Sequence, residues 1–393
     1  MRIHILGLGP IGCLVAYHLR RTLPARHPIT IIHKTQRMAV MARQAGNIIT
    51  METSGVTITA NDFDQETADP HDEMLPVRNS KSTSTNPAFA PKSNVTTPIE
   101  SLIVCVKAHK TLTAIRDLLP RISKDSTIVL VQNGMGVYEH LIQNLFRNQE
   151  QRPHFVLASV NHGAWLKEYL HVVHAGAGDL TFGIVPDYHG RQFEASLPDL
   201  NLDDITPNTH NDPSANHYLS LRNTIAALSS LSVLNTSWKS MYDTHMTMRR
   251  KVVVNAVINP LTALLNCRNG DVLAHKSGQN ICRNVCQEAS NAFQAQWKSE
   301  LKDASNAGHD VGDAQFPEAL SAASLVLECK RVAELTRFNY SSMLMDVRRA
   351  RDTEILFLNG YLLGLGRKHN IYMPANNLLM NMMDLRSRIP LLS

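Results

Sequence analysis

The feature that most constrains the fold is a glycine-rich loop at the start of the sequence. A short apolar run, Ile3 to Leu6, leads directly into Gly7-Leu8-Gly9-Pro10-Ile11-Gly12. Pro10 suits the first turn of a helix, apolar residues then recur at helical spacing, and a second apolar run follows at 28–32. The order strand, Gly-x-Gly-x-x-Gly loop, helix, strand is typical of a βαβ unit that binds a dinucleotide.

The three glycines of this loop have separate physical roles in such a unit. Gly7 permits the tight turn, Gly9 lets a pyrophosphate approach the N–H groups at the helix N-terminus, and Gly12 lets the helix pack on the strand. We therefore expect this loop to bind the cofactor, through Gly7, Leu8, Gly9, Pro10, Ile11 and Gly12. The alternative is a glycine-rich turn with a structural role only.

The end of the second apolar run indicates which dinucleotide binds. NAD sites usually carry an Asp or Glu there for the ribose 2′-hydroxyl, but this sequence continues as His33-Lys34-Thr35-Gln36-Arg37. Lys34, with Arg37 nearby, can pair with a 2′-phosphate, which favours NADPH/NADP as the cofactor. The alternative is a solvated basic turn.

Length and composition agree with a globular protein of two domains. The chain has 393 residues, of which 44% are hydrophobic and 19% are charged. No apolar run reaches the roughly 18 residues of a membrane span, so we expect no membrane partner. Lys and Arg exceed Asp and Glu by 39 to 34 without forming a basic block, so we expect no nucleic-acid partner.

The cysteines suggest a reducing compartment and no metal. The chain has 6 cysteines without a Cys-x-x-Cys pair, and Cys282 and Cys286 lie one helical turn apart without a His pair at zinc-ligand spacing. We expect reduced core thiols, no bound metal and a cytoplasmic location, because no targeting segment precedes the first apolar run. Association with mitochondria is left open.

The pattern along the chain predicts two domains. We expect an α/β N-terminal Rossmann-type dinucleotide-binding domain over residues 1–240 and an all-α C-terminal domain over 241–393, with the active site in the cleft between them. Buried strands are expected at 102–106, 127–131 and 155–158, and the β segments 171–174 and 180–183 are expected to complete the same sheet. Helices are expected near 220–231, 241–265, 278–301, 317–337 and 352–369.

Two polar stretches interrupt the first domain. Residues 61–98 and 187–216 are rich in Asp, Ser, Thr, Asn and Pro, and we interpret both as polar insertions. Between them, Lys107 follows one expected parallel strand and Asn133 follows the next. Because ligands bind at the carboxyl edge of such sheets, both residues are site candidates by position.

A polar stripe marks the first helix of the second domain. Lys251, Asn255 and Asn259 lie at i, i+4 and i+8 in an otherwise apolar segment, so they share one face of the helix. Pro260 follows and removes a backbone donor. An ammonium and two amides on one face suit an anionic carbonyl compound, whereas the alternative is a helix contact in which the three polar groups satisfy one another.

The segment that contains the stripe resembles that of a known family. The segment from Lys251 to Gly270 is similar to the signature helix of ketopantoate reductases (2-dehydropantoate 2-reductases), and further family blocks occur in family order. These blocks are the loop 7–12, Val106-Lys107-Ala108, Gln132 to Gly136, and Asn339 to Asp346 running on to Thr353-Glu354 and Leu358-Asn359-Gly360. The two polar insertions depart from the compact bacterial pattern.

The resemblance implies an NADPH-dependent reduction of 2-dehydropantoate (ketopantoate) to pantoate, a step of pantothenate and coenzyme A biosynthesis. It implies Lys251 as the general acid that donates a proton to the ketone oxygen. The implied substrate-binding residues are Asn133, Asn255, Asn259, Ser342 for the carboxylate and Glu354 for the terminal hydroxyl. Lys107 and Asn133 are implied where cofactor and substrate meet.

Several alternatives stay open from the sequence alone. Ser342 can instead cap the helix that follows, and Glu354 can be a surface residue that complements a helix dipole. The same fold and cofactor can serve another 2-keto acid, or a non-catalytic family member can use the fold for binding. A homodimer is also left open.

Overall fold

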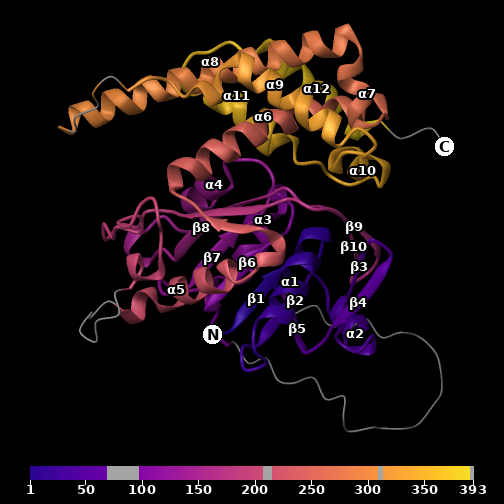
Figure 1. The fold of residues 1–393 in the computed structure, drawn as a ribbon, viewed down its shortest axis with the longest axis vertical. Coiled ribbons are helices and arrows are strands. Elements are labelled where there is room, and N and C mark those ends of the chain that lie inside the picture. The colour runs from indigo at the N-terminus through magenta and orange to yellow at the C-terminus, as the bar shows by residue number, and fades with distance from the viewer. Residues whose placement is uncertain (69–96, 207–214, 309–311, 313, 390–393) are drawn as a thin grey trace. The chain divides into compact units, whose positions relative to one another are not determined.

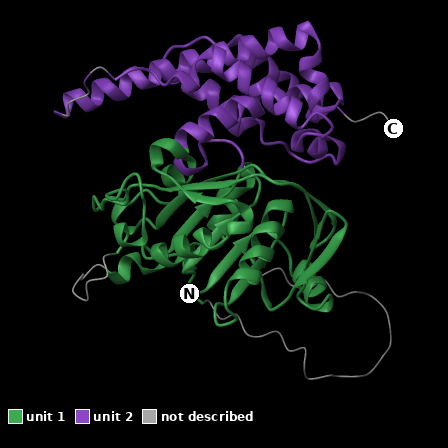
Figure 2. Ribbon diagram, viewed as in Figure 1, with its two compact units in different colours: residues 1–132, 140–244 green, residues 133–139, 245–393 purple. Residues whose placement is uncertain are grey.

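The computed structural model describes residues 1–68, 97–206, 215–308, 312 and 314–389. Contacts within the chain divide it into two compact units (Figure 2). Unit 1 comprises Met1–Gln132 and His140–Thr244, and unit 2 comprises Asn133–Glu139 and His245–Ser393. Each unit has its own hydrophobic core.

A sheet of 8 strands forms the centre of unit 1, in the order β12-β11-β8-β7-β6-β1-β2-β5 (Figure 1). The strands from β8 to β5 pair in parallel, whereas β11 runs antiparallel to β8. The buried strands predicted at 102–106, 127–131 and 155–158 are confirmed as β6, β7 and β8. The strands are β1 (Ile3–Leu6), β2 (Ile29–His33), β5 (Phe63–Thr67), β6 (Ser101–Val104), β7 (Thr127–Leu130), β8 (His154–Val160), β11 (Leu180–Ile184) and β12 (Thr236–Trp238).

A second sheet of 4 strands has the order β4-β3-β10-β9. Its strands are β3 (Ile49–Thr53), β4 (Val56–Ala60), β9 (Gly163–Glu168) and β10 (His171–Gly176). The prediction that residues 171–174 complete the main sheet is wrong, because a turn at Leu170 (φ 61°) folds β10 back on β9 and β10 then pairs in parallel with β3. Residues 180–183 do join the main sheet, as part of β11.

The interpretation of 61–98 as a polar insertion is wrong at its start. Residues 63–67 form β5, which pairs in parallel with β2 at the edge of the main sheet. Phe63 and Gln65 are buried while Asp64 between them is exposed, so a short strand with one buried face looked polar in composition. Residues 69–96 lie outside the described residues.

The second polar stretch, 187–216, also contributes to the core of unit 1. Phe193 and Ile205 are 3% and 0% exposed and belong to that core. Asp187 accepts a hydrogen bond from the buried Tyr218 hydroxyl at 2.5 Å. The described part of the stretch is therefore packed, and its residues 207–214 lie outside the described residues.

Helices complete unit 1. They are α1 (Pro10–Thr22), α2 (Gln36–Gln44), α3 (Ala108–Arg116), α4 (Val137–Asn144), which crosses into unit 2, α5 (Ala215–Ser229), and the 3-10 turns η2 (Leu119–Arg121), η3 (Gln149–Gln151), η4 (Leu202–Asp204) and η5 (Ser232–Leu234). α1 contacts β1 of the main sheet and β3, β9 and β10 of the second sheet, which explains why both of its faces are buried. The helix predicted near 220–231 corresponds to α5.

Unit 2 is helical throughout its described part. Its elements are α6 (Met241–Leu265), which begins in unit 1, α7 (Asn269–Ala274), α8 (Lys276–Asn306), α9 (Ala322–Leu335), α10 (Ser342–Arg348), α11 (Asn359–Lys368), α12 (Pro374–Arg388), η6 (Glu318–Leu320) and η7 (Ile355–Phe357). The helix predicted at 241–265 is confirmed, the segment near 278–301 lies within the longer α8, and the segment near 317–337 contains α9. The segment 352–369 is not one helix, because the backbone of Leu358 (φ −111°, ψ −97°) separates η7 from α11.

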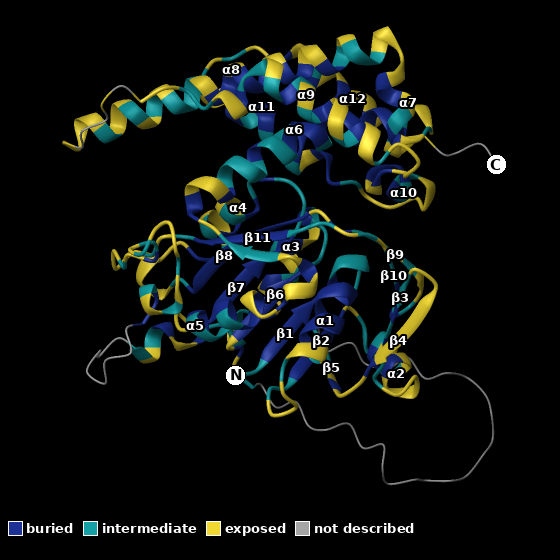
Figure 3. Cartoon of the chain, viewed as in Figure 1, coloured by how far each residue is buried: buried dark blue, intermediate teal, exposed yellow. Residues whose placement is uncertain are grey.

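Burial follows this architecture. The strands of the main sheet from β11 to β2 are buried along their length, whereas β12 and β5 at its two edges are only partly buried. The helices of unit 2 bury one face and expose the other (Figure 3). Within the described part of the chain, none of the helices combines the length and the apolar character that a membrane span needs.

Candidate active site

The glycine-rich loop has the shape that a dinucleotide phosphate requires. Gly7 has φ +101°, and a Cβ atom on it would lie 2.6 Å from the Val106 nitrogen. A Cβ atom on Gly12 would lie 1.9 Å from the Gly7 oxygen, so the start of α1 packs directly on the loop. By contrast, nothing lies within 4 Å of a Cβ atom built on Gly9, and no side chain caps the helix at that residue. At Gly9, the N-cap residue, the loop thus leaves space beside the N-terminus of α1, a position that favours anions.

The chain after β2 presents two exposed cations. His33 is buried and contacts Gln65 Oε1 and the Tyr169 hydroxyl, both at 2.5 Å. Burial lowers the pKa of His33, so this imidazole stays neutral near pH 7. Lys34 comes next in the chain and is exposed, as is Arg37. Lys34 is therefore the charge that β2 places at the carboxyl edge of the sheet.

Lys107 and Gln132 follow β6 and β7 at the same edge. Lys107 is half-buried at the N-cap position of α3, and its carbonyl accepts a hydrogen bond from Thr111 Oγ1 at 3.3 Å. Gln132 Nε2 donates to the same Thr111 hydroxyl oxygen at 2.9 Å. The sheet edge therefore brings the two chain positions together, as parallel pairing predicts.

Asn133 begins the short segment that belongs to unit 2. Met135 N–H donates to the Phe357 carbonyl at 2.9 Å, and Gly134 has φ +89° with the Phe357 oxygen only 2.5 Å from where its Cβ would be. This close backbone contact requires glycine and fixes the segment against η7. Two sequence blocks far apart in the chain, around Asn133 and Glu354, are therefore neighbours in unit 2.

The polar stripe is present on α6. Lys251 and Asn255 are half-buried and Asn259 is 9% exposed, whereas Val252, Val253 and other apolar residues of the same helix are buried in the core of unit 2. One face of α6 thus carries an ammonium and two amides, while the apolar residues of the helix pack in the core of unit 2. That arrangement suits a small polar ligand with an apolar carbon skeleton.

A buried amide compensates for the proline inside α6. Pro260 has no N–H, so it cannot donate to the Ala256 carbonyl four residues earlier. Asn359, 0% exposed at the start of α11, donates its Nδ2–H to this carbonyl at 3.1 Å. Asn359 therefore holds α6 at the turn between Asn255 and Asn259.

The same amide is part of a network that reaches two more helices. Asn359 Nδ2 also donates to Asn376 Oδ1 at 3.1 Å, and Asn376 Nδ2 donates to Glu288 Oε2 at 2.8 Å. Glu288 on α8 further accepts the backbone N–H groups of Ala375 and Asn376 at 2.8 and 3.0 Å. In the sequence Asn359 stands out only as part of a family block. The signal for its role in the network is Pro260, because a proline within a helix leaves a carbonyl in need of a donor.

Ser342 is not the N-cap of α10 but the residue that follows the N-cap. Ser341 caps α10 by accepting the Leu344 N–H at 3.1 Å, and its hydroxyl accepts a hydrogen bond from Thr262 Oγ1 at 2.7 Å. The alternative that Ser342 caps the helix is therefore wrong, and Ser342 is exposed. The Thr262–Ser341 bond places the start of α10 next to the turn of α6 that follows Asn259.

Glu354 is a buried carboxyl group. It is 5% exposed and directly precedes η7, without a side-chain capping bond. The alternative of a surface residue is therefore wrong. Burying a carboxylate is costly unless it contacts polar groups, and Glu354 has such an interaction within the protein.

Two groups of side chains within the described residues could hold a metal ion. One is His154, Asp187 and His217, in which His217 Nδ1 contacts Asp125 at 2.5 Å and His154 Nε2 donates to the His217 carbonyl at 2.9 Å. These bonds belong to the network that joins the start of β8 to α5. The other group is Cys282, Cys286 and Cys329.

Comparison with known proteins identifies the family. The N-terminal model of the ketopantoate reductases PanE/ApbA matches residues 3–187, and the C-terminal model of the same family matches residues 243–387. The chain belongs to the ketopantoate reductase family. It is accordingly an oxidoreductase, and the expected fold of an α/β dinucleotide-binding domain with a helical C-terminal region is confirmed.

Individual relatives cover nearly the whole chain. A probable 2-dehydropantoate 2-reductase of Schizosaccharomyces pombe is 26% identical over 386 residues, which are 96% of this chain and 94% of the relative. A PanE/ApbA family ketopantoate reductase from Ralstonia eutropha has the same fold, with a TM-score of 0.66, 19% identity and 98% of each chain covered. D-mandelate dehydrogenase, solved with NADH and anilino(oxo)acetate, also shares the fold, with a TM-score of 0.66, 14% identity and 98% of each chain covered.

Proposed function

We propose that this protein reduces 2-dehydropantoate (ketopantoate) to pantoate with NADPH, in the cytoplasm, as a step of pantothenate and coenzyme A synthesis. The observation that carries the proposal is the stripe of Lys251, Asn255 and Asn259 on α6, inside the region matched by the C-terminal family model. The name of the S. pombe relative supports the substrate, and the free state of all 6 cysteines agrees with the compartment.

In this proposal Lys251 is the general acid. Its ammonium group donates a hydrogen bond to the ketone oxygen, polarises the carbonyl and transfers the proton as the oxygen gains charge. Asn255 and Asn259, one and two turns further along the same face, orient the substrate oxygens. Asn359 donates to the Ala256 carbonyl and so fixes the turn of α6 between the two amides.

Ser342 and Glu354 select the two ends of the substrate. The exposed hydroxyl of Ser342 donates to the substrate carboxylate, and the buried carboxylate of Glu354 accepts the terminal hydroxyl of ketopantoate. Asn133, fixed against η7 by the Met135–Phe357 bond, contributes where cofactor and substrate meet, together with Lys107.

The loop 7–12 and Lys34 account for the cofactor. The open space at Gly9 accepts the pyrophosphate, and Lys34 pairs with a 2′-phosphate. The residues directly after β2 include no Asp or Glu that would instead bind the 2′-hydroxyl of NAD. The fold relative solved with NADH supports a nicotinamide dinucleotide. When bound, this group supplies the hydride, and the residues above supply orientation and the proton.

The decisive experiment measures NADPH oxidation by the purified protein with ketopantoate. It is run beside 2-keto-3-methylbutyrate, which lacks the terminal hydroxymethyl group, and phenylglyoxylate, and pantoate is identified by mass spectrometry. We expect the highest kcat/KM with ketopantoate. A higher kcat/KM with another 2-keto acid would replace the substrate, and no turnover with any of them would favour a binding protein.

A further inference from the structure

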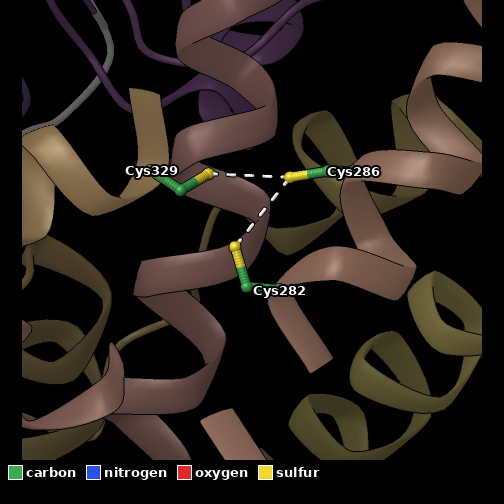
Figure 4. Close-up of side chains that lie close together, drawn as sticks. All are labelled: Cys282, Cys286 and Cys329. Carbon is green, nitrogen blue, oxygen red and sulfur yellow. Dashed lines mark hydrogen bonds between the residues drawn. The ribbon is translucent and has the colours of Figure 1, made fainter. Parts of the chain in front are cut away.

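Three thiols from two helices meet in the core of unit 2. Cys282 and Cys286 lie one turn apart on α8, and Cys329 faces them from α9, which packs against α8. Their sulfur atoms point toward a common centre (Figure 4). The residues are 1%, 0% and 0% exposed, so the thiols meet away from water.

The spacing of the sulfur atoms is that of ligands around one ion. The Sγ atoms of Cys282 and Cys286 are 3.9 Å apart, those of Cys286 and Cys329 are 3.8 Å apart, and all three lie within 4.8 Å of one another. Three sulfur atoms bound at about 2.3 Å to a single ion are about 3.8–4.0 Å apart, in pyramidal or planar geometry. The thiols therefore need little movement to share an ion.

The surroundings favour a divalent cation. Three thiolates and a divalent ion carry one net negative charge, whereas a monovalent ion would leave two in an apolar core. The exposed cations Arg283 and Lys330 directly follow Cys282 and Cys329 in the chain. The described residues within ligand distance include no fourth His, Cys, Asp or Glu, which favours a soft cation that accepts three sulfur ligands.

We propose that Cys282, Cys286 and Cys329 form a site for a soft divalent d10 cation, with Cd²⁺ as its best probe. Binding breaks three S–H bonds, forms three sulfur–metal bonds and releases three protons to solvent, without oxidation. The ion joins α8 to α9 and stabilises unit 2. This site is separate from the residues proposed for catalysis, so it stands or falls independently of the proposed function.

The test titrates Cd²⁺ into the full-length protein, kept reduced with a phosphine. We expect one Cd²⁺ per chain, an ultraviolet thiolate-to-cadmium absorption band, about three protons released per ion, and a higher melting temperature. Cd²⁺ is also supplied during expression and then counted by elemental analysis, so that slow entry into the buried site cannot hide binding.

Cys286→Ala is the central variant, because Cys286 contacts both other sulfur atoms. It should weaken Cd²⁺ binding by more than about 100-fold, whereas the control Cys267→Ala, a half-buried thiol of the same unit outside the cluster, should leave it unchanged. If Cys286→Ala does not fold, the ¹¹³Cd NMR shift of the wild-type complex still counts the bound thiolates.

Three results would overturn the proposal. They are fewer than one Cd²⁺ per chain by both routes, equal binding by Cys286→Ala and wild type, and a ¹¹³Cd shift without three sulfur ligands. Loss of two of these thiols to a disulfide under mild oxidation, with no Cd²⁺ binding, would instead identify a redox pair.

Discussion

The cofactor loop of unit 1 and the polar stripe of unit 2 are built in opposite ways. The loop 7–12 consists of consecutive residues, and its shape depends on backbone geometry and on missing side chains at Gly7, Gly9 and Gly12. The stripe depends on side chains whose positions are set by contacts from distant helices. Asn359 supports α6 at Ala256, and Ser341 supports it at Thr262.

This difference predicts two kinds of sensitivity. A substitution in the loop should affect cofactor binding directly, because it fills the space available to the cofactor. A change in the support of α6 should reach the stripe without touching it, because buried hydrogen-bond networks transmit the loss of one partner to the others.

Lys251→Ala should give the largest effect. We expect kcat to fall by about 10²–10⁴-fold with cofactor affinity nearly unchanged, because the lost interaction belongs to the transition state. Steady-state assays with ketopantoate measure kcat, and fluorescence titrations with NADPH measure the cofactor affinity. Lys298→Ala, which removes an exposed lysine of α8, is the matched control and should be neutral.

Lys251→Arg separates charge from proton donation. Arginine keeps the positive charge but does not release its proton near neutral pH, so substrate binding should be partly retained while kcat stays low. A fully active Lys251→Ala protein would remove the proposed mechanism.

Lys34→Ala tests the choice of cofactor in unit 1. We expect NADPH to bind about 10–100-fold more weakly while NADH binding changes little, because a charged pair with phosphate contributes about 1.5–3 kcal/mol. Lys124→Ala is the control, since this exposed lysine precedes β7 and so lies at the opposite edge of the sheet. An equal loss for both cofactors would contradict the assignment.

Glu354→Ala tests the substrate selector of unit 2. Its removal should reduce the ratio of kcat/KM for ketopantoate to that for 2-keto-3-methylbutyrate by about 10-fold, because only ketopantoate offers a terminal hydroxyl to the carboxylate. Asp352→Ala, which removes an exposed acid two residues earlier, should leave the ratio unchanged. An unchanged ratio in Glu354→Ala would refute the selector role.

The parts of the structure that were predicted from sequence are those fixed by local patterns. The glycine loop, the buried strands β6, β7 and β8, and the helix 241–265 each carry their signal within one segment. β5 was missed because an edge strand with one exposed face resembles polar sequence, and β10 was placed in the wrong sheet because its partner β3 is far away in the chain.

The site residues show the same limit. The stripe of Lys251, Asn255 and Asn259 follows from helical periodicity alone. The burial of Glu354 and the division of roles between Ser341 and Ser342 depend on tertiary contacts that no spacing reveals. Their catalytic and binding roles stay predictions until the variants are measured.

Asn359→Leu should have the smallest effect on the reaction itself. It tests whether the support behind the stripe affects substrate binding. The substitution keeps the branched shape and the number of heavy atoms but leaves the Ala256 carbonyl without a donor, so we expect the free energy of unfolding to fall by about 1–3 kcal/mol. KM for ketopantoate should rise, because the turn between Asn255 and Asn259 is no longer held. Urea denaturation and steady-state kinetics measure both, with the exposed Asn377→Leu as control.

Pro260→Ala provides the way to show that the proline is the cause. Alanine restores the N–H that α6 lacks at this position, so the Ala256 carbonyl regains a donor within the helix. In that background Asn359→Leu should cost about 1 kcal/mol less than in the wild type, while the bond from Asn359 to Asn376 is lost in both. Strictly additive costs would mean that Asn359 acts only through Asn376 and α12. A coupled result would show that a side chain of α11 replaces the missing backbone donor and thereby holds the stripe in place.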